Sequence, residues 1–361
     1  MLEQVAAAFE RKDYQTAAKL LQSLLQESPD NPWVQLYLGK LHEVSHKRRE
    51  AERVYRQLLV LTTHPKVLIQ ARQGLQRLEA IKQEDRQRAI AQATTETTNQ
   101  EFGALILEPL NNEIKATVVK NFAQIMQLDV YTARLVIPSR GWRLYKTGQL
   151  GELQFYGKQL QQAGIPCFWV GLPHIQNLQV YQVQYFAQNQ PQPKVICTNE
   201  TNQTGHLTFN WSEVTAIVEG LLPIFEKVVD VNARRQLLRK TQTQDYARFC
   251  DLHLRTRQSI LRLYDHGYQF SQGLEVAAPQ DGQNTITINW NHLSSWIKQQ
   301  LPQVKTWSDF TPFAETALDQ TELLAHITPQ IPLLRQEKTN WDAAFHLYSG
   351  CIFTKELVIS H

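Results

Sequence analysis

The N-terminal part of the chain repeats a pattern of small and apolar residues at an offset of about 34 residues. The matching pairs are Ala17 and Ala51, Leu21 and Tyr55, and Leu24 and Leu58. A repeat of this period is typical of stacked helix-turn-helix units, each of which buries its apolar side against the next unit. The pattern therefore predicts a helical N-terminal region, and it indicates binding rather than chemistry.

These positions resemble the consensus of the tetratricopeptide repeat (TPR) family. The resemblance implies that the small residues Ala17, Gly39 and Ala51 lie where paired helices cross, because a larger side chain would push the helices apart. Pro29 and Pro65 follow the second helix of each copy, where a missing N–H group ends a helix. The resemblance covers less than a fifth of the chain, so it describes one module only.

The TPR resemblance also implies a concave face on the inner helices. In the second copy this face would carry Trp33, Leu36, Lys40 and Glu43, which we take as candidate partner-binding residues. The family's carboxylate clamp has an Asn where this sequence has Ala6, so we do not expect the face to capture the C-terminus of a partner. A plain helical hairpin bundle without a groove is the alternative.

The length of 361 residues exceeds what one growing core supports, so several domains are expected. The polar stretch from Ala93 to Gln100 lacks helical periodicity and predicts a linker. We expect a multidomain α+β protein. Its parts are a TPR-like domain at residues 1–92, a linker at 93–101, a small α/β domain at 102–173, a strand-rich domain with a closing helix at 174–304, and a helical, aromatic tail at 305–361 that packs back on the sheet.

Hydrophobic periodicity places the elements within these parts. A helical run from Lys66 to about Ala93 is expected to close the repeat stack. In the α/β domain, strands are expected at 102–107, 142–145 and 165–170, and helices at 115–128, 130–136 and 151–163. In the strand-rich domain, strands are expected at 178–186, 194–198, 206–211, 246–254 and 259–264. Ile286 to Ile288 alternates and predicts a further strand before a helix at 293–301.

The strand-rich part with its closing helix resembles the pleckstrin-homology-like or GRAM-like architecture, through the order of its elements alone. The whole chain also resembles a group of TPR-containing proteins of cyanobacteria. The stretches from Phe209 to Gly220 and from Trp307 to Leu318 carry this second likeness. Neither resemblance implies an activity, because function depends on a site and not on a fold.

A basic band interrupts an otherwise balanced sequence. Residues 227–262 carry nine basic and three acidic side chains, whereas the whole chain has a net charge of +3. The candidate anion-binding residues are Arg234, Arg235, Arg239, Lys240, Arg248, Arg255 and Arg257. Such a band can contact phosphates of nucleic acid or of anionic lipid, with Tyr246 as a stacking candidate, although its alternation with Cys250 favours a core position. An ordinary solvated or self-paired face, or an acidic protein partner, is the alternative.

The sequence lacks the usual signals of catalysis and of cofactor binding. No glycine-rich phosphate loop is present, and the four scattered cysteines form no metal or disulfide pattern, so we expect no cofactor and no metal. Asp251, His253, Asp265 and His266 are the nearest approach to an acid/base group, but a polar outer sheet face explains them as well. We therefore do not expect an enzyme.

No stretch of 18 uninterrupted apolar residues occurs, and the N-terminus has no basic patch followed by an apolar run. We expect a cytoplasmic protein without a transmembrane segment. The leading hypothesis is a scaffold or assembly adaptor that binds a partner polypeptide through the TPR-like groove. The alternative hypothesis is an anion-binding module that uses residues 234–262.

Overall fold

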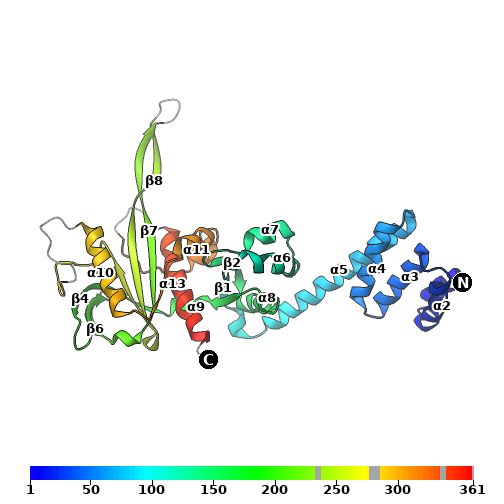
Figure 1. Cartoon of the computed structure of the whole chain (residues 1–361), viewed down its shortest axis with the longest axis horizontal. Coiled ribbons are helices and arrows are strands. Elements are labelled where there is room, and N and C mark those ends of the chain that lie inside the picture. Colours follow the sequence, from blue (N-terminus) through cyan, green and yellow to red (C-terminus); the bar gives the residue numbers. More distant parts are fainter. Residues whose placement is uncertain (232–236, 276–284, 334–338, 360–361) are drawn as a thin grey trace. The chain divides into compact units, whose positions relative to one another are not determined.

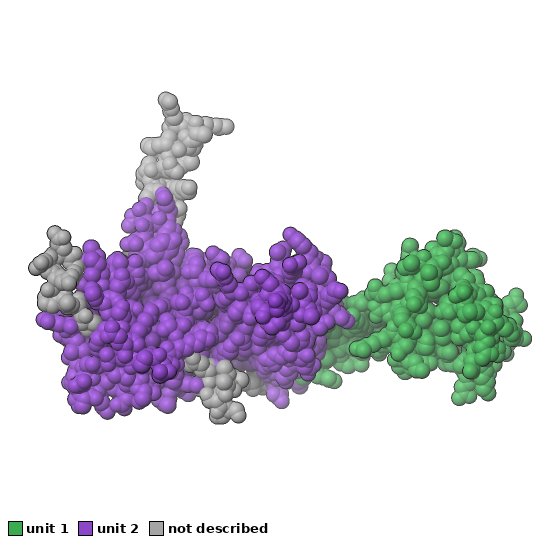
Figure 2. Space-filling model, in the orientation of Figure 1, with its two compact units in different colours: residues 1–92 green, residues 93–361 purple. Residues whose placement is uncertain are grey.

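The chain divides into two units, residues 1–92 and residues 93–361 (Figure 2). The computed structural model describes residues 1–231, 237–275, 285–333 and 339–359. The first unit is helical, whereas the second contains two β-sheets and the remaining helices (Figure 1). Within the described residues, no helix is both long and apolar enough to cross a membrane.

The first unit is a row of antiparallel helix pairs. Its helices are α1 (Leu2–Glu10), α2 (Tyr14–Glu27), α3 (Pro32–Val44), α4 (Arg48–Leu61) and α5 (Pro65–Ala93). Local signals set the boundaries: the Asp13 side chain accepts from Thr16 N at 3.1 Å and caps α2, and the Asn31 side chain accepts from Trp33 N at 3.0 Å and caps α3. Pro32 and Pro65 begin α3 and α5, where the missing N–H group costs nothing.

Small residues allow these helices to approach closely. Ala17 and Ala51 are fully buried, as the repeat pattern predicts. The Tyr55 ring lies between Gly39 of α3 and Gly74 of α5, where a Cβ atom would stand 2.5 and 2.4 Å from ring carbons. Gly39 therefore packs against the Tyr55 ring. Gly74 packs against the other side of the same ring, a contact that the repeat pattern did not reveal.

The second unit begins with a three-stranded antiparallel sheet in the order β2-β1-β3. Its strands are β1 (Phe102–Leu107), β2 (Arg143–Gln149) and β3 (Cys167–Gly171), and its helices are α6 (Asn112–Met126), α7 (Val130–Val136), α8 (Leu150–Gln162) and α9 (Leu172–Gln176). A short 3-10 helix, η1 (Thr97–Gln100), precedes β1. Alternate residues of β1 pack on opposite faces: Leu105 and Leu107 contact the core under α6 and α8, and Ala104 and Ile106 contact a different core.

A seven-stranded sheet follows, in the order β10-β7-β8-β9-β4-β5-β6. Its strands are β4 (Gln179–Gln188), β5 (Lys194–Thr198), β6 (Thr204–Thr208), β7 (Val214–Val231), β8 (Leu237–Leu254), β9 (Ser259–Tyr264) and β10 (Lys305–Trp307). The 3-10 helices η2 (Trp211–Glu213) and η3 (Arg255–Arg257) precede β7 and β9. Pairs β4–β9 and β10–β7 are parallel and the others antiparallel, and the ribbon of β7 and β8 extends away from the other strands (Figure 1).

The C-terminal helix α13 (Asn340–Ile359) lies between the two sheets (Figure 1). Its residues from Ala343 to Phe353 are all buried, and they share one core with β1, β3, β7, β8, α11 (Phe310–Ala317) and α12 (Thr321–Ala325). A helix that is apolar on all sides must be covered on all sides. The segments 102–173, 174–304 and 305–361, which the sequence suggested as separate parts, therefore form one unit around a shared core.

The predicted strand at Ile286–Ile288 is wrong. These residues form the first turn of α10 (Ile286–Gln300), whose Thr285 side chain caps the helix by accepting from Ile288 N. Trp290, Leu293 and Ile297 are buried at helical spacing against the seven-stranded sheet, whereas Ile286 and Ile288 stay exposed. The alternation of Ile286 and Ile288 does not decide the structure, because a longer helix buries more apolar surface through Trp290, Leu293 and Ile297 than a short strand would.

Substitution of Gly74 by alanine tests the helix contact in the first unit. Alanine favours a helix by roughly 0.5–1 kcal/mol over glycine, yet its Cβ would collide with the rigid Tyr55 ring, so we expect a net loss of about 1–3 kcal/mol. The measurement is helical circular dichroism of the full chain during urea unfolding, with the exposed Gln73→Ala on the same helix as control. A Gly74→Ala variant at least as stable as Gln73→Ala would contradict this packing.

Candidate functional site

Helices α1, α3 and α5 form the inner row of the first unit, and polar side chains link α3 to α5. Lys40 Nζ donates to Gln70 Oε1 at 2.7 Å, and Arg77 donates to both oxygens of Glu43 at 2.7 and 2.9 Å. Lys40 and Glu43 are three residues apart on α3, and Gln70 and Arg77 are seven apart on α5. The bonds therefore follow one another along the line where α3 and α5 meet, which we call the seam. We call the surface formed by Tyr37, Lys40, Glu43, Gln70 and Arg77 the inner face.

Below the seam, Tyr55 connects all three of the later helices. Its hydroxyl donates to Glu43 Oε2 at 2.7 Å while its ring fills the space between Gly39 and Gly74. Burial and the Glu43 charge raise the pKa of Tyr55 far above its ordinary value. Burial acts to raise the pKa of Glu43, but hydrogen bonds from Arg77 and Tyr55 outweigh it and leave that pKa low. The carboxylate is thus fixed in place as an anion.

The inner face also offers a cation and aromatic rings. Lys40 Nζ lies 5.2 Å from the centroid of the Tyr37 ring, and the Phe9 ring packs on Tyr37 at 5.3 Å. Burial, with the nearby positive charge of Arg77, lowers the pKa of Lys40. Because part of its hydration is already lost, Lys40 forms stronger contacts with an incoming acceptor than a fully solvated lysine does.

The four residues that the sequence suggested for this face have different positions. Lys40 and Glu43 are half-buried on the seam, as described above. Leu36 is fully buried in the core with Tyr55 and Leu58, so it is wrong as a surface contact. Trp33 is half-buried and packs edge-on against His64, with ring centroids 5.3 Å apart. Of the four, Lys40 and Glu43 are the ones that the fold brings together.

The comparison with protein families agrees with this geometry. The family model described as tetratricopeptide repeat matches residues 8–63, which run from the end of α1 to just beyond α4. The N-terminal region contains tetratricopeptide repeats. Neither the curated proteins nor the solved structures gave a match to the chain. Tetratricopeptide repeats are protein-interaction modules. Tyr37, Lys40 and Glu43 of the inner face lie within the matched residues, and Gln70 and Arg77 lie on the helix that follows them.

The basic band does not form an open patch among the described side chains. Arg257 donates to both oxygens of Glu213 at 2.7 and 2.8 Å and to Thr208 O at 2.8 Å. Arg248 donates to Thr287 Oγ1 at 3.2 Å and lies 3.5 Å from Asp265, while Arg255 is half-buried at the start of η3. Arg234 and Arg235, and the side chains of Arg239 and Lys240, lie outside the described residues.

The predicted acid/base group separates into two pairs. Asp265 accepts from His266 Nδ1 at 2.7 Å, whereas Asp251 and His253 are fully buried under α13 instead of lying on an outer sheet face. Arg262 holds both oxygens of Asp251 at 2.7 and 2.8 Å and also donates to Pro329 O at 2.8 Å. Among the described side chains, no three His, Cys, Asp or Glu gather as a metal site does.

Ser349 of α13 completes this buried network in an order unlike that of a hydrolase triad. Its hydroxyl donates to Asp251 Oδ2 at 2.7 Å, so it accepts from His253 Nε2, which lies 2.9 Å away. In a nucleophilic triad the serine gives its proton to histidine, and histidine is the residue that the carboxylate orients. Here the carboxylate holds the serine, and the network fixes α13 on the sheet. Sequence reasoning missed Ser349, because it lies some 100 residues from its partners.

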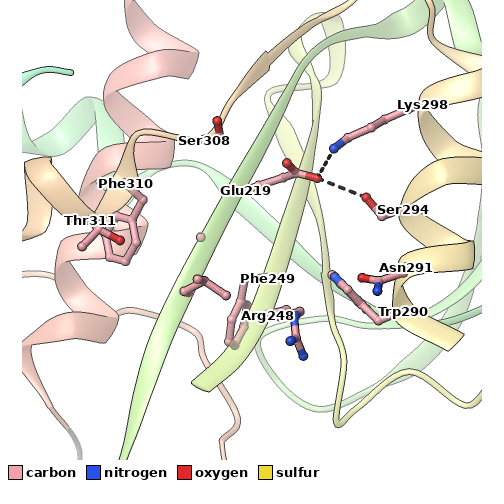
Figure 3. Close-up of a pocket in the computed structure, with 12 residues that line it drawn as sticks. Glu219, Arg248, Phe249, Trp290, Asn291, Ser294, Lys298, Ser308, Phe310 and Thr311 are labelled. Carbon is pink, nitrogen blue, oxygen red and sulfur yellow. Dashed lines mark hydrogen bonds and ion pairs between the residues drawn. The ribbon is translucent and has the colours of Figure 1, made fainter. Parts of the chain in front are cut away.

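A cleft in the second unit lies at the root of the β7–β8 ribbon (Figure 3). Its volume is about 340 Å³, and it is lined by β7, β8, α10 and the start of α11. Glu219 of β7 points toward α10, where its Oε1 accepts from Ser294 Oγ at 3.1 Å and Lys298 Nζ at 2.7 Å (Figure 3). Leu221, Arg248 and Thr311 also line the cleft. No motif in the sequence indicated this site.

The buried histidines give the second unit a measurable pH dependence. Burial lowers the pKa of His253 to about 4 and that of His346 to about 3, against an ordinary value of 6.5. Below pH 6.5 the unfolded chain takes up protons on these residues that the folded chain does not. The free energy of unfolding should therefore fall with decreasing pH, by about 1.4 kcal/mol per pH unit for each histidine, until the folded pKa is reached.

Urea unfolding at pH 6 and pH 5 measures this dependence. His253→Gln keeps a donor for Ser349 but cannot titrate, so the loss of stability between these pH values should be about 1.4 kcal/mol smaller in this variant than in the natural chain. The exposed His292→Gln is the matched control and should leave the dependence unchanged. Identical pH dependence in the natural chain and the His253→Gln variant would show that His253 titrates normally.

Proposed function

We propose that the protein is a non-enzymatic interaction scaffold or assembly adaptor, which binds a segment of another protein on the inner face of its tetratricopeptide repeats. The observation that carries the proposal is the combination of a repeat match at residues 8–63 with Lys40, Tyr37 and Arg77 on one surface. Lys40 and Arg77 have N–H groups beyond those they give to Gln70 and Glu43, the oxygens of Glu43 and Gln70 have further lone pairs, and Tyr37 supplies an aromatic surface. A polypeptide segment with acceptors and apolar side chains fits this set.

The short repeat stack implies that this surface is not sufficient alone. The inner face is formed by residues of two helices, α3 and α5, so it contacts only a short segment of a partner. A second contact on the same partner, made by the second unit, raises the effective concentration and so the overall affinity. An adaptor with two modest contacts also releases its partner more readily than one with a single tight contact does, which suits assembly.

The anion-binding alternative has less support. Arg248 and Arg257 already have carboxylate or hydroxyl partners in the chain, and a phosphate would have to displace them. The resemblances to pleckstrin-homology-like domains and to cyanobacterial proteins stay predictions, as does a cytoplasmic location, and no activity is taken from them.

Charge reversal on the inner face tests the proposed function. Lys40→Glu replaces the central cation with an anion, and about tenfold less partner should co-purify with the full chain, as expected for a loss of roughly 1.4 kcal/mol of binding free energy. The measurement is quantitative mass spectrometry of proteins bound to the tagged chain. Arg56→Glu is the matched control, because it makes the same change of charge at an exposed residue of α4. In the described structure, the Arg56 side chain pairs with Glu52 of its own helix. Equal recovery of every partner by both variants would exclude the inner face.

A further inference from the structure

Strand β7 has an edge that is paired over only part of its length. On one side it pairs with β8 along the whole strand. On the other side β10 pairs with it in parallel at residues 216–218, and the chain then turns after Trp307 into α11. In the described part of the chain, no further strand pairs with this edge beyond Val218. A sheet edge of this kind accepts another strand, because its main-chain groups lack partners.

The register shows which residues present their main chain to the open edge. Asp265 N donates to Arg248 O at 3.1 Å, so Arg248 directs its main-chain groups toward β9 and away from β7. In an antiparallel pair, opposite residues either exchange both hydrogen bonds or none. Leu221 stands opposite Arg248, so its N–H and C=O groups point away from β8. Glu219, two residues earlier in unbroken register, does the same.

The open edge begins after β10 and is interrupted at Pro223. Ile217 precedes it and is covered by β10 at Thr306. Pro223 follows it and has no N–H group to offer, a residue type that commonly limits pairing at sheet edges. Between β10 and Pro223 the edge thus provides two complete donor and acceptor sets, on Glu219 and Leu221. A few residues of extended chain fill this stretch, which is the part of the edge that the cleft covers.

The cleft of about 340 Å³ lies directly over this window (Figure 3). On the α10 side it has Ser294 and Lys298, which hold Glu219, and on the other side it has Ser308 and Thr311. Only glycine fits at position 220, because a Cβ atom there would lie 2.5 Å from the Phe345 ring and 3.1 Å from the Phe310 ring. Leu221 is 46% exposed and lines the cleft, so its side chain is accessible to a segment bound there.

We propose that Glu219 and Leu221 form a strand-addition site for an extended segment of a partner polypeptide. The added segment continues the line of β10 and pairs with the main chain of both residues. Side chains of adjacent strands lie side by side on the same face, which sets the preference of the site. In the added segment, the residue beside Glu219 and Ser294 is polar, the residue beside Gly220 and Thr311 is small, and the residue beside Leu221 is apolar. This inference rests on the proposed function, because it supplies the second contact of the adaptor.

Hydrogen exchange of the free chain provides the first test. The amides of Glu219 and Leu221 should exchange much faster than the amide of Gly220, which points toward β8, when each is resolved by NMR. Protection of Leu221 equal to that of Gly220 would mean that the edge is already filled, and the proposal would fail. Size-exclusion chromatography of the same sample then distinguishes a second copy from a segment of the same chain as the occupant.

Binding to an array of eight-residue peptides, scanned by position, provides the second test. The full chain should select peptides with the polar, small, apolar order, and Leu221→Pro should weaken their binding about tenfold more than Leu221→Ala, because only proline removes the N–H group. A peptide set that both variants bind equally, or no selection at all, would overturn the proposal. Lys40→Glu separates the two sites: peptides held at the β7 edge should bind this variant normally, whereas those held on the inner face should not.

Discussion

The second unit depends on the burial of one helix between two sheets. Helix α13 has apolar side chains on every side, so it is stable only where both neighbouring layers are present. Polar contacts join it to the sheet: Ser349 bonds to Asp251 and His253, and Arg262 neutralises the Asp251 charge. Removal of Asp251 or Arg262 alone would leave an uncompensated buried charge, which strongly destabilises a fold.

The same core determines where the candidate docking surfaces lie. Because α13 and α11 cover one face of the β7–β8 ribbon and α10 covers the other, the ribbon is held firmly only at its root. The chain must leave the β7 edge after Trp307 to form α11, and this departure exposes Glu219 and Leu221. In the first unit, by contrast, the surface arises from a repeat, in which the Tyr55 ring sets the spacing of α3, α4 and α5.

Much of the secondary structure follows from local sequence, and much of the tertiary structure does not. The strands 102–107, 194–198 and 259–264 and the helix 130–136 begin and end where apolar runs, caps and prolines predict. Asp251 and His253 show the limit: their alternation with Cys250 and Leu252 indicates an outer polar face, yet a helix almost 90 residues later covers them. Tyr246 shows the converse, since it alternates with core residues but is 49% exposed where α10 no longer covers the ribbon. The open β7 edge depends on where β10 pairs with β7 and leaves it, a contact between residues 89 positions apart that the local pattern of neither strand reveals.

The position of α13 in the chain has a consequence for how the protein acquires its structure. Strand β1 packs against a helix that begins over 200 residues later, whereas the helices of the first unit contact their immediate neighbours. Contacts between distant residues form slowly, because a long loop must close before they gain any energy. During synthesis at about 5–20 residues per second, the more than 200 residues between β1 and α13 take roughly 10–40 s, so the apolar face of β1 stays uncovered for that time while the helical repeats are already complete.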